Sequence, residues 1–252
     1  MLIAITRAVS PRINECVLTH VAREPIDEGG RARLQHQLYE QCLEETCCQL
    51  FHLPAEPKLP DSVFVEDTAI VLDELAVMTT PGAEPRRAET ASVAEVLRQY
   101  RRLFHIQPPG TLDGGDVLRV ARTLYVGLSK RSNPQGIEQL RRLVTPFGYS
   151  VTAVPLHDCL HLKSAVTQVA DQVLLINRQW VDGACFGSMA LALVRCGLLT
   201  LRIRSRLRLM PYELTPAWFI RQRFPGPGNG WKNMASRCER WRLRNSPKLR
   251  AA

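Results

Sequence analysis

Three acidic residues, Asp61, Glu66 and Asp67, lie close together in one apolar stretch of the sequence. A guanidinium group donates hydrogen bonds in a fixed planar fork, so paired carboxylates are its natural partners. In a fully extended strand Glu66 and Asp67 would point to opposite faces, and a shared site therefore needs a strand end or a bulge. The alternative is that these acids only cap a strand at a solvated loop, where acidic side chains usually lie.

A second acidic segment, Leu-Asp-Gly-Gly-Asp-Val over residues 112–117, surrounds two adjacent glycines. Glycines let the backbone turn tightly ahead of the apolar strand that follows, and a plain turn is the simpler interpretation. His161 lies in an alternating apolar segment and is a candidate general acid and base. An acid that orients one ring nitrogen would leave the other free for proton transfer, and Asp113 is the candidate. Taken alone, a histidine in such a segment is more often structural than catalytic.

A different chemistry, the binding of a carboxylate, is offered by three arginines in segments expected to be loops: Arg86, Arg87 and Arg131. Each taken alone is typical of a solvated surface charge. Two of them together would hold a carboxylate through paired hydrogen bonds, because each guanidinium presents a rigid fork of donors. Acids and arginines converging on one central cavity would suit a zwitterionic amino acid with a cationic head group.

The segments that would position these residues alternate between strand-like and helix-like patterns. Apolar residues at helical spacing predict helices over residues 28–50, 88–102 and 134–147. Short apolar segments predict strands over residues 2–6, 63–72, 75–79, 116–121, 123–128, 151–155, 161–167 and 172–177. The recurring order of strand, strand, helix and strand predicts a repeating α/β architecture rather than a sheet of alternating parallel strands.

The composition, with 45% hydrophobic and 23% charged residues, is that of an ordinary soluble globular protein. No apolar run is long enough to span a bilayer, and the first residues lack the features of a signal peptide. The eight cysteines are irregularly spaced and fit neither a zinc site nor a redox pair. We therefore expect a cytoplasmic protein with reduced thiols.

The net charge of +9 comes entirely from the C-terminal part of the chain. Residues 195–252 hold 14 of the 33 lysines and arginines and two of the 24 acids, which gives +12. Residues 1–194 hold the other 19 basic and 22 acidic groups, which gives −3. The segment 195–252 is also rich in arginine, proline and tryptophan and keeps no helical or strand period. We expect it to be disordered and not to pack against residues 1–194.

Four segments, in this order, resemble the dimethylarginine dimethylaminohydrolases and the wider arginine deiminase and amidinotransferase group. They are Phe-Val-Glu-Asp-Thr at 64–68, Leu-Asp-Gly-Gly-Asp-Val at 112–117, Gly-Leu-Ser-Lys-Arg-Ser-Asn at 127–133 and Cys-Leu-His-Leu-Lys-Ser at 159–164. The resemblance covers residues 1–194 and implies a five-bladed α/β propeller of ββαβ units with a central active site. Because residues 195–252 do not continue the pattern, we expect the last unit to be missing or disordered.

The resemblance implies a substrate-binding role for five of the residues above. Glu66 and Asp67 would hold the guanidinium group, and Asp61 would meet the α-ammonium group of the substrate. Arg86 and Arg131 would bind the substrate carboxylate, and Arg87 is an alternative to Arg86 for this contact. The implied partner is a small guanidine, a methylated arginine, and a homodimer is possible.

The resemblance also implies a reaction. His161, oriented by Asp113, would act as the general acid and base while a cysteine thiolate attacks the guanidinium carbon. An alkylamine would leave, and water would hydrolyse the thiouronium intermediate to citrulline. No metal or organic cofactor is implied, since the bound cation itself favours the thiolate.

The family's nucleophile lies near its C-terminus in a Gly-Gly-x-Thr-Cys context, and residues 1–252 contain no such segment. Cys185, Cys196 and Cys238 have different surroundings and are poor substitutes, because nucleophile and base must meet within hydrogen-bond reach. In the neighbouring reading frame, with free choice of synonymous codons, residues 218–229 and 237–252 become similar to the family's C-terminal sequence. We therefore hypothesise a frameshift between about residues 183 and 209, with a basic extension acquired by fusion as the alternative.

Three functions remain open from the sequence alone. The first is a hydrolase of methylated arginine, inactive in this chain because the nucleophile is lost. The second is a pseudoenzyme of the same fold that still binds the substrate. The third is nucleic-acid binding through the basic segment 195–252, whose charges have no ordered scaffold.

Overall fold

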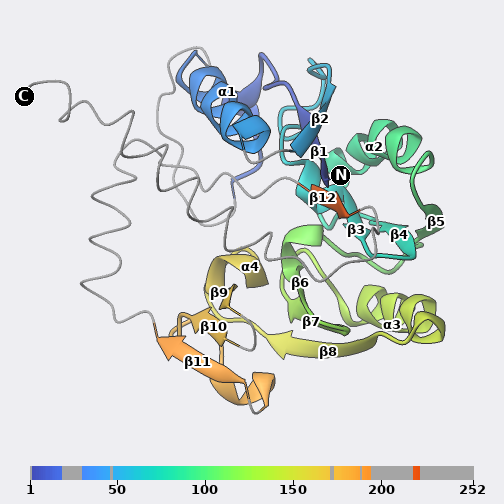
Figure 1. Cartoon of the computed structure of the whole chain (residues 1–252), viewed down its shortest axis with the longest axis vertical. Coiled ribbons are helices and arrows are strands. Elements are labelled where there is room, and N and C mark those ends of the chain that lie inside the picture. The colour runs from blue at the N-terminus through green and yellow to red at the C-terminus, as the bar shows by residue number, and fades with distance from the viewer. Residues whose placement is uncertain are drawn as a thin grey trace, which may run out of the picture.

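The computed structural model describes residues 2–18, 30–45, 48–170, 173–187, 189–193 and 218–221. Within these residues the strands form four sheets of three strands each. Every sheet joins one antiparallel pair to one parallel pair. Figure 1 shows the sheets following one another clockwise in chain order, from β1 and β2 at the top to β9–β11 at the lower left.

The first sheet contains both ends of the described chain. Strand β1 (Leu2–Arg7) is central, and helix α1 (Gly30–Glu45) leads from it to the parallel strand β2 (Cys48–Leu53). Strand β12 (Trp218–Arg221) pairs with β1 from the other side in antiparallel register. A strand from the basic segment therefore takes the place that the first strand of a ββαβ unit holds in the other sheets.

The next two sheets are complete ββαβ units, in which the helix connects the parallel pair. The second unit contains β3 (Ala69–Val71), β4 (Leu75–Met78), α2 (Thr90–Leu97) and β5 (Arg102–His105). The third contains β6 (Val117–Val120), β7 (Thr123–Leu128), α3 (Pro134–Val144) and β8 (Ser150–Pro155). Helix α3 starts at the predicted proline, and the side chain of Asn133 caps it by accepting a hydrogen bond from the Gly136 N–H.

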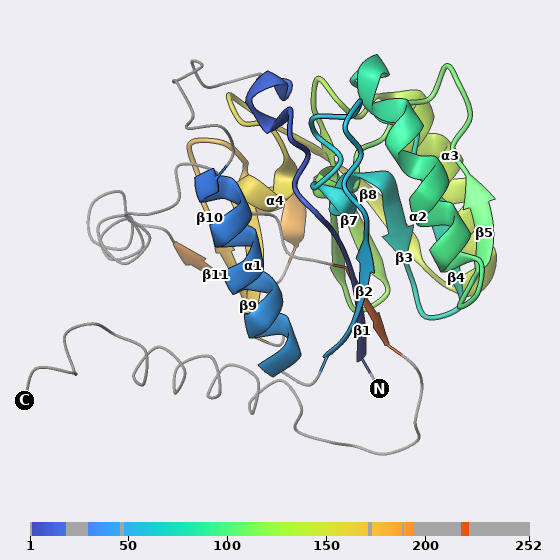
Figure 2. The same cartoon turned by 90° about the horizontal axis from the view of Figure 1, so that it is seen from above.

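The fourth sheet contains β9 (Val166–Ala170), β10 (Val173–Ile176) and β11 (Ala190–Leu193). Its described connection from β10 to the parallel strand β11 is the short 3₁₀ helix η6 (Gly183–Phe186) rather than an α-helix. Figure 1 shows α1, α2 and α3 at the periphery of the strands, and Figure 2 shows the same elements from above. The predicted repeat of strand, strand, helix and strand is thus confirmed for the second and third units.

The hydrophobic core continues from one unit into the next. Strand β4 is buried on both faces, with Ala76 and Met78 in a cluster with β1 and α2. Leu75 and Val77, which point the other way, join a cluster with β6, β7 and α3. Because alternate residues of a strand face opposite sides, one strand connects the first three units.

Five predicted boundaries are wrong, and pairing between strands explains two of them. The helix predicted over residues 28–50 ends at Glu45, since residues 48–53 pair with β1 as strand β2. The helix predicted over 88–102 ends at Leu97, and β5 follows from Arg102. The helix predicted over 134–147 becomes the 3₁₀ helix η5 (Thr145–Phe147) after Val144.

The other two corrections concern segments that carry candidate site residues. The strand predicted over 63–72 begins as the 3₁₀ helix η2 (Val65–Thr68), and only residues 69–71 form β3. The strand predicted over 161–167 begins as the short helix α4 (Leu162–Ala165), and β9 starts at Val166. Both segments leave the extended conformation where the sequence carries its polar residues.

The prediction of a disordered segment over 195–252 lies outside the described residues, except for β12. The domain boundary at residue 194 therefore stays a prediction. Among the described helices, none is long and apolar enough to cross a membrane.

Candidate active site

Three short elements bring the candidate catalytic residues together. Helix η2 carries Glu66 and Asp67, Asp113 directly precedes the 3₁₀ helix η4 (Gly114–Asp116), and His161 directly precedes α4. Helix η4 contacts both η2 and α4. A Cβ atom on Gly114 would lie 2.0 Å from the carbonyl oxygen of Glu66, so only glycine allows η2 and η4 to approach this closely.

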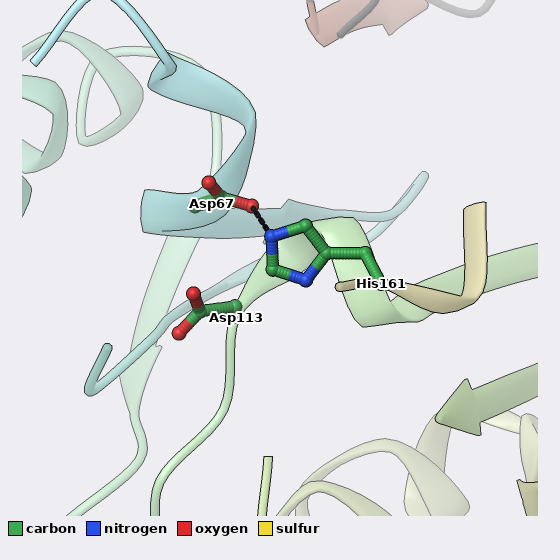
Figure 3. Close-up of side chains that lie close together, drawn as sticks. All are labelled: Asp67, Asp113 and His161. Carbon is green, nitrogen blue, oxygen red and sulfur yellow. Dashed lines mark ion pairs between the residues drawn. The ribbon is translucent and has the colours of Figure 1, made fainter. Parts of the chain in front are cut away.

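Asp67 contacts both a buried arginine and the histidine of the site. Its carboxylate accepts hydrogen bonds from Arg86 Nη1 at 2.7 Å and from the backbone N–H of Gly115 at 3.0 Å. His161 Nε2 lies 3.7 Å from Asp67 Oδ1, as Figure 3 shows. Burial alone would raise the pKa of Asp67, but Arg86 and His161 outweigh it and lower the pKa to about 2. Asp67 is therefore ionised at neutral pH.

His161 is buried among three carboxylates. Burial alone would lower its pKa, but Asp67, Asp116 and Asp113 outweigh this and raise the pKa to about 9. The imidazole is therefore protonated at neutral pH in the absence of a ligand. Its Nδ1 lies 3.4 Å from Asp116 Oδ1, an electrostatic contact rather than a well-aligned hydrogen bond.

Asp116 is fully buried and holds the segment around His161 in place. Its Oδ2 accepts hydrogen bonds from the hydroxyls of Ser129 and Ser132, at 2.6 and 2.7 Å. Its Oδ1 accepts the backbone N–H of Leu162 at 3.1 Å, directly after His161. Sequence reasoning missed the role of Asp116, although it is the second acid of the glycine-containing motif.

Asp113 reaches the cluster from the same side of the imidazole as Asp67 (Figure 3). Its Oδ1 accepts the backbone N–H of Gly82 at 2.8 Å, and its Oδ2 lies 3.9 Å from Arg131 Nη1. Burial and the charge of Asp67 raise the pKa of Asp113 to about 6. The structure thus brings Asp113 to His161, while Asp116 is the acid at Nδ1. The orienting role of Asp113 stays a prediction.

Arg86 is buried in an ion-pair network. Besides the bond to Asp67, its Nε and Nη2 donate to the carboxylate of Glu89, at distances of 2.9–3.2 Å. Its Nη2 also approaches the carbonyl oxygens of Asp61 and Phe64, at 3.5 and 3.3 Å. Most of its donors are therefore engaged within the protein. Sequence reasoning missed Glu89, which is three residues from Arg86 on the same short helix.

Asp61 is joined to the cluster through this arginine. Its side-chain carboxylate accepts the backbone N–H of Val17 with both oxygens, at 3.1 Å. Glu66 pairs with Lys163, whose Nζ lies 2.5 Å from Glu66 Oε1. Lys163, the second residue after His161, was likewise missed by sequence reasoning.

All seven predicted site residues are therefore buried and connected: Asp61, Glu66, Asp67, Arg86, Asp113, Arg131 and His161. The arrangement provides a protonated imidazole, an ionised carboxylate beside it and a second carboxyl group with a raised pKa. Such a set can bind a cationic group and can donate or accept a proton.

One atom from each of Asp67, Asp113 and His161 lies within 4.8 Å of the others, the only such set of possible metal ligands among the described residues. A metal would need a neutral imidazole, whereas the raised pKa keeps His161 protonated. Asp67 is also already paired with Arg86. Without a ligand, the cluster is therefore a network of ion pairs within the protein rather than a preformed metal site.

Comparison with known proteins places these features in a family. The family model for arginine deiminase matches residues 51–189, more than half of the chain. The N(G),N(G)-dimethylarginine dimethylaminohydrolase of Streptomyces coelicolor is 44% identical over 173 residues, which cover 68% of this chain and 67% of the relative. The enzyme of the same name from Pseudomonas aeruginosa is 33% identical over 155 residues, 61% of either chain. The chain thus spans about two thirds of these relatives.

A solved structure of the Pseudomonas aeruginosa enzyme, a cysteine-to-serine variant in complex with citrulline, has a TM-score of 0.69 and 28% identity. The match covers 75% of this chain and 74% of that one. Fold and site together define an α/β propeller of the arginine deiminase and amidinotransferase superfamily. The chain belongs to the dimethylarginine dimethylaminohydrolase family, whose members are C–N hydrolases. The predicted family and fold class are confirmed.

Proposed function

We propose that the cluster around His161 is the binding site for a methylated arginine. The observation that carries the proposal is the buried set of Asp67, Asp113 and His161, joined from three separate chain segments. The names of the relatives and the citrulline bound to one of them support the same ligand class. Asp67, Glu66 and Asp113 would surround the cationic head group.

In the proposed reaction His161 moves the proton. Its pKa of about 9 means that it starts protonated and can give a proton to the leaving amine. A cysteine thiolate would attack the guanidinium carbon, and water would then release citrulline from the thiouronium intermediate. Of the two arginines proposed for the substrate carboxylate, Arg86 contacts Asp67 and Glu89, and Arg131 lies near Asp113.

The 252-residue chain, in this proposal, binds its ligand without hydrolysing it. The sequence holds no Gly-Gly-x-Thr-Cys segment to supply the thiol. None of the proposed ligand contacts involves that thiol, so binding does not depend on it directly. The frameshift between about residues 183 and 209 is our proposed origin of the difference from the family.

Calorimetric titration with asymmetric dimethylarginine tests the binding. We expect saturable binding that Asp113→Asn weakens at least about tenfold, since a charge-assisted hydrogen bond to the cation is lost. Glu95→Gln is the matched control, because Glu95 is an exposed acid on α2 that pairs only with Arg98 among the described residues. Circular dichroism checks that both variants fold. Absence of binding by the unmodified chain, or equal affinity of the two variants, would contradict the proposed site.

A further inference from the structure

We propose that Lys163 determines specificity in this site by occupying Glu66 and thereby favouring alkylated guanidines over unmodified arginine. This inference rests on the proposed function and adds a residue that the reaction itself does not use. The family resemblance assigned Glu66 to the guanidinium group. The structure shows that a cation of the protein already holds one of its oxygens.

Two parallel contacts join η2 to α4. Asp67 faces His161, and its neighbour Glu66 pairs with Lys163 at 2.5 Å. Glu66 is 7% exposed and the side chain of Lys163 is 19% exposed, so water screens this ion pair only in part. The ammonium group of Lys163 therefore lies beside the cluster at the carboxylate that would otherwise receive a second edge of the substrate cation.

The ion pair changes what Glu66 can offer to a ligand. Burial raises the pKa of Glu66, and the ammonium group of Lys163 acts against this shift. A buried carboxylate that already compensates one cation gains less from a second one. Lys163 therefore favours the ionised form of Glu66, but it reduces the net negative charge of the pair and the number of acceptors that the head group meets.

The acceptors that remain match an alkylated guanidine. Two buried carboxylate oxygens, Glu66 Oε2 and Asp113 Oδ2, accept no hydrogen bond within the described part of the chain. Arginine presents five N–H donors, and methylating both positions of one terminal nitrogen removes two of them. Unmodified arginine would bury donors that find no acceptor, whereas the dimethylated head group has none on that nitrogen.

The test compares the affinities of asymmetric dimethylarginine and arginine for the full chain by calorimetric titration. Lys163→Met keeps the length of the side chain and frees Glu66 Oε1 for the ligand. We expect the preference for dimethylarginine over arginine, measured as the ratio of the two affinities, to fall by about tenfold. This is the effect of one buried N–H donor of arginine gaining its acceptor. Lys163→Arg, which keeps the charge on Glu66, should retain the original ratio. Lys58→Met, at an exposed position, should change neither affinity.

The outcomes separate this proposal from the proposed function. If the unmodified chain binds neither ligand, the proposed function fails and the role of Lys163 fails with it. If the chain binds dimethylarginine and Lys163→Met changes both affinities by the same factor, or neither, Lys163 has a structural role only and the inference is wrong. If Lys163→Met does not fold, Lys163→Leu takes its place, since it also removes the donor that occupies Glu66 Oε1. An unchanged affinity ratio in that variant would overturn the inference equally.

Discussion

Asp67 interacts with two cations, since it accepts a hydrogen bond from Arg86 and faces His161. The two cations keep its pKa at about 2, against the effect of burial. A third cation, the guanidinium group of a ligand, would be compensated by Glu66 and Asp113 as much as by Asp67. The residue that looks like the main ligand carboxylate in the sequence is thus also a structural counter-ion.

Arg86 and Arg87 offer a direct comparison at this scale. Arg86→Met removes the counter-ion of two buried carboxylates and should lower the free energy of unfolding by roughly 3–5 kcal/mol. Arg87→Met removes an exposed side chain whose Nε donates to the Pro81 carbonyl. It should change the free energy of unfolding by less than about 1 kcal/mol. Urea denaturation measures both. Equal losses in the two variants would show that the buried network does not stabilise the fold.

The protonation of His161 makes stability depend on pH. Its pKa is about 9 in the folded chain and about 6.5 in the unfolded one. The stabilisation is fully present below about pH 6.5 and is lost as the pH rises through about 9, because the folded state binds the extra proton. In His161→Gln the free energy of unfolding should fall less steeply between these values. Asp113 and Glu89, whose pKa values are raised to about 6 and 7, affect the pH dependence of stability mainly at lower pH. Parallel curves for the two proteins would contradict the assignment.

The sequence identified the residues that carry the chemistry but not those that hold them. Asp67, Asp113 and His161 lie in motifs where an unusual residue type interrupts an apolar pattern. Asp116 and Glu89 fit turns and helix starts equally well, and their importance depends on contacts with Ser129, Ser132 and Arg86 from other segments. Such contacts follow from the packing of the units and have no local signal in the sequence.

At the scale of elements, 3₁₀ helices and one short α-helix replace the predicted strand starts. Glu66 and Asp67 would point to opposite faces of a strand, whereas η2 lets Glu66 pair with Lys163 while Asp67 meets His161. The sequence predicted that the acids needed a strand end or a bulge. It could not show which, because an apolar run of this length fits several local conformations.

The close contact between η2 and η4 can be tested with Gly114→Ala. The added Cβ would lie 2.0 Å from the backbone oxygen of Glu66, and neither backbone can move as freely as a side chain. We expect the free energy of unfolding to fall by roughly 1–3 kcal/mol, as overpacking typically costs. Ligand affinity should fall as well, since η2 and η4 carry Asp67 and Asp113. A variant as stable as the unmodified chain would show that the two helices lie further apart.

At the scale of the whole molecule, stability comes from interfaces between neighbouring units. The cluster of β1, β4 and α2 and the cluster of β6, β7 and α3 share the two faces of β4. The sequence predicted this repeat from the order of its elements, but the pairing of β12 with β1 has no counterpart in the pattern of residues 195–252. Residues 1–194 carry a net charge of −3 and residues 195–252 a net charge of +12, so the two parts differ in charge as well as in sequence pattern.

The last prediction concerns turnover by the whole chain. The 252-residue chain should release citrulline from asymmetric dimethylarginine no faster than a buffer control. His161 and the carboxylates can bind and protonate a guanidine, but its resonance-stabilised carbon still needs a nucleophile, whose removal typically costs roughly 10⁴- to 10⁶-fold in rate. A version whose reading frame is corrected between residues 183 and 209, so that it ends in the family's Thr-Cys context, should turn over.

Two results would contradict this account in different ways. Turnover by the 252-residue chain that persists after His161→Ala would show that the reaction occurs elsewhere. Turnover that depends on His161 and on Cys185, Cys196 or Cys238 would instead reveal a replacement nucleophile, because only a thiol within reach of the imidazole can complete the proposed reaction.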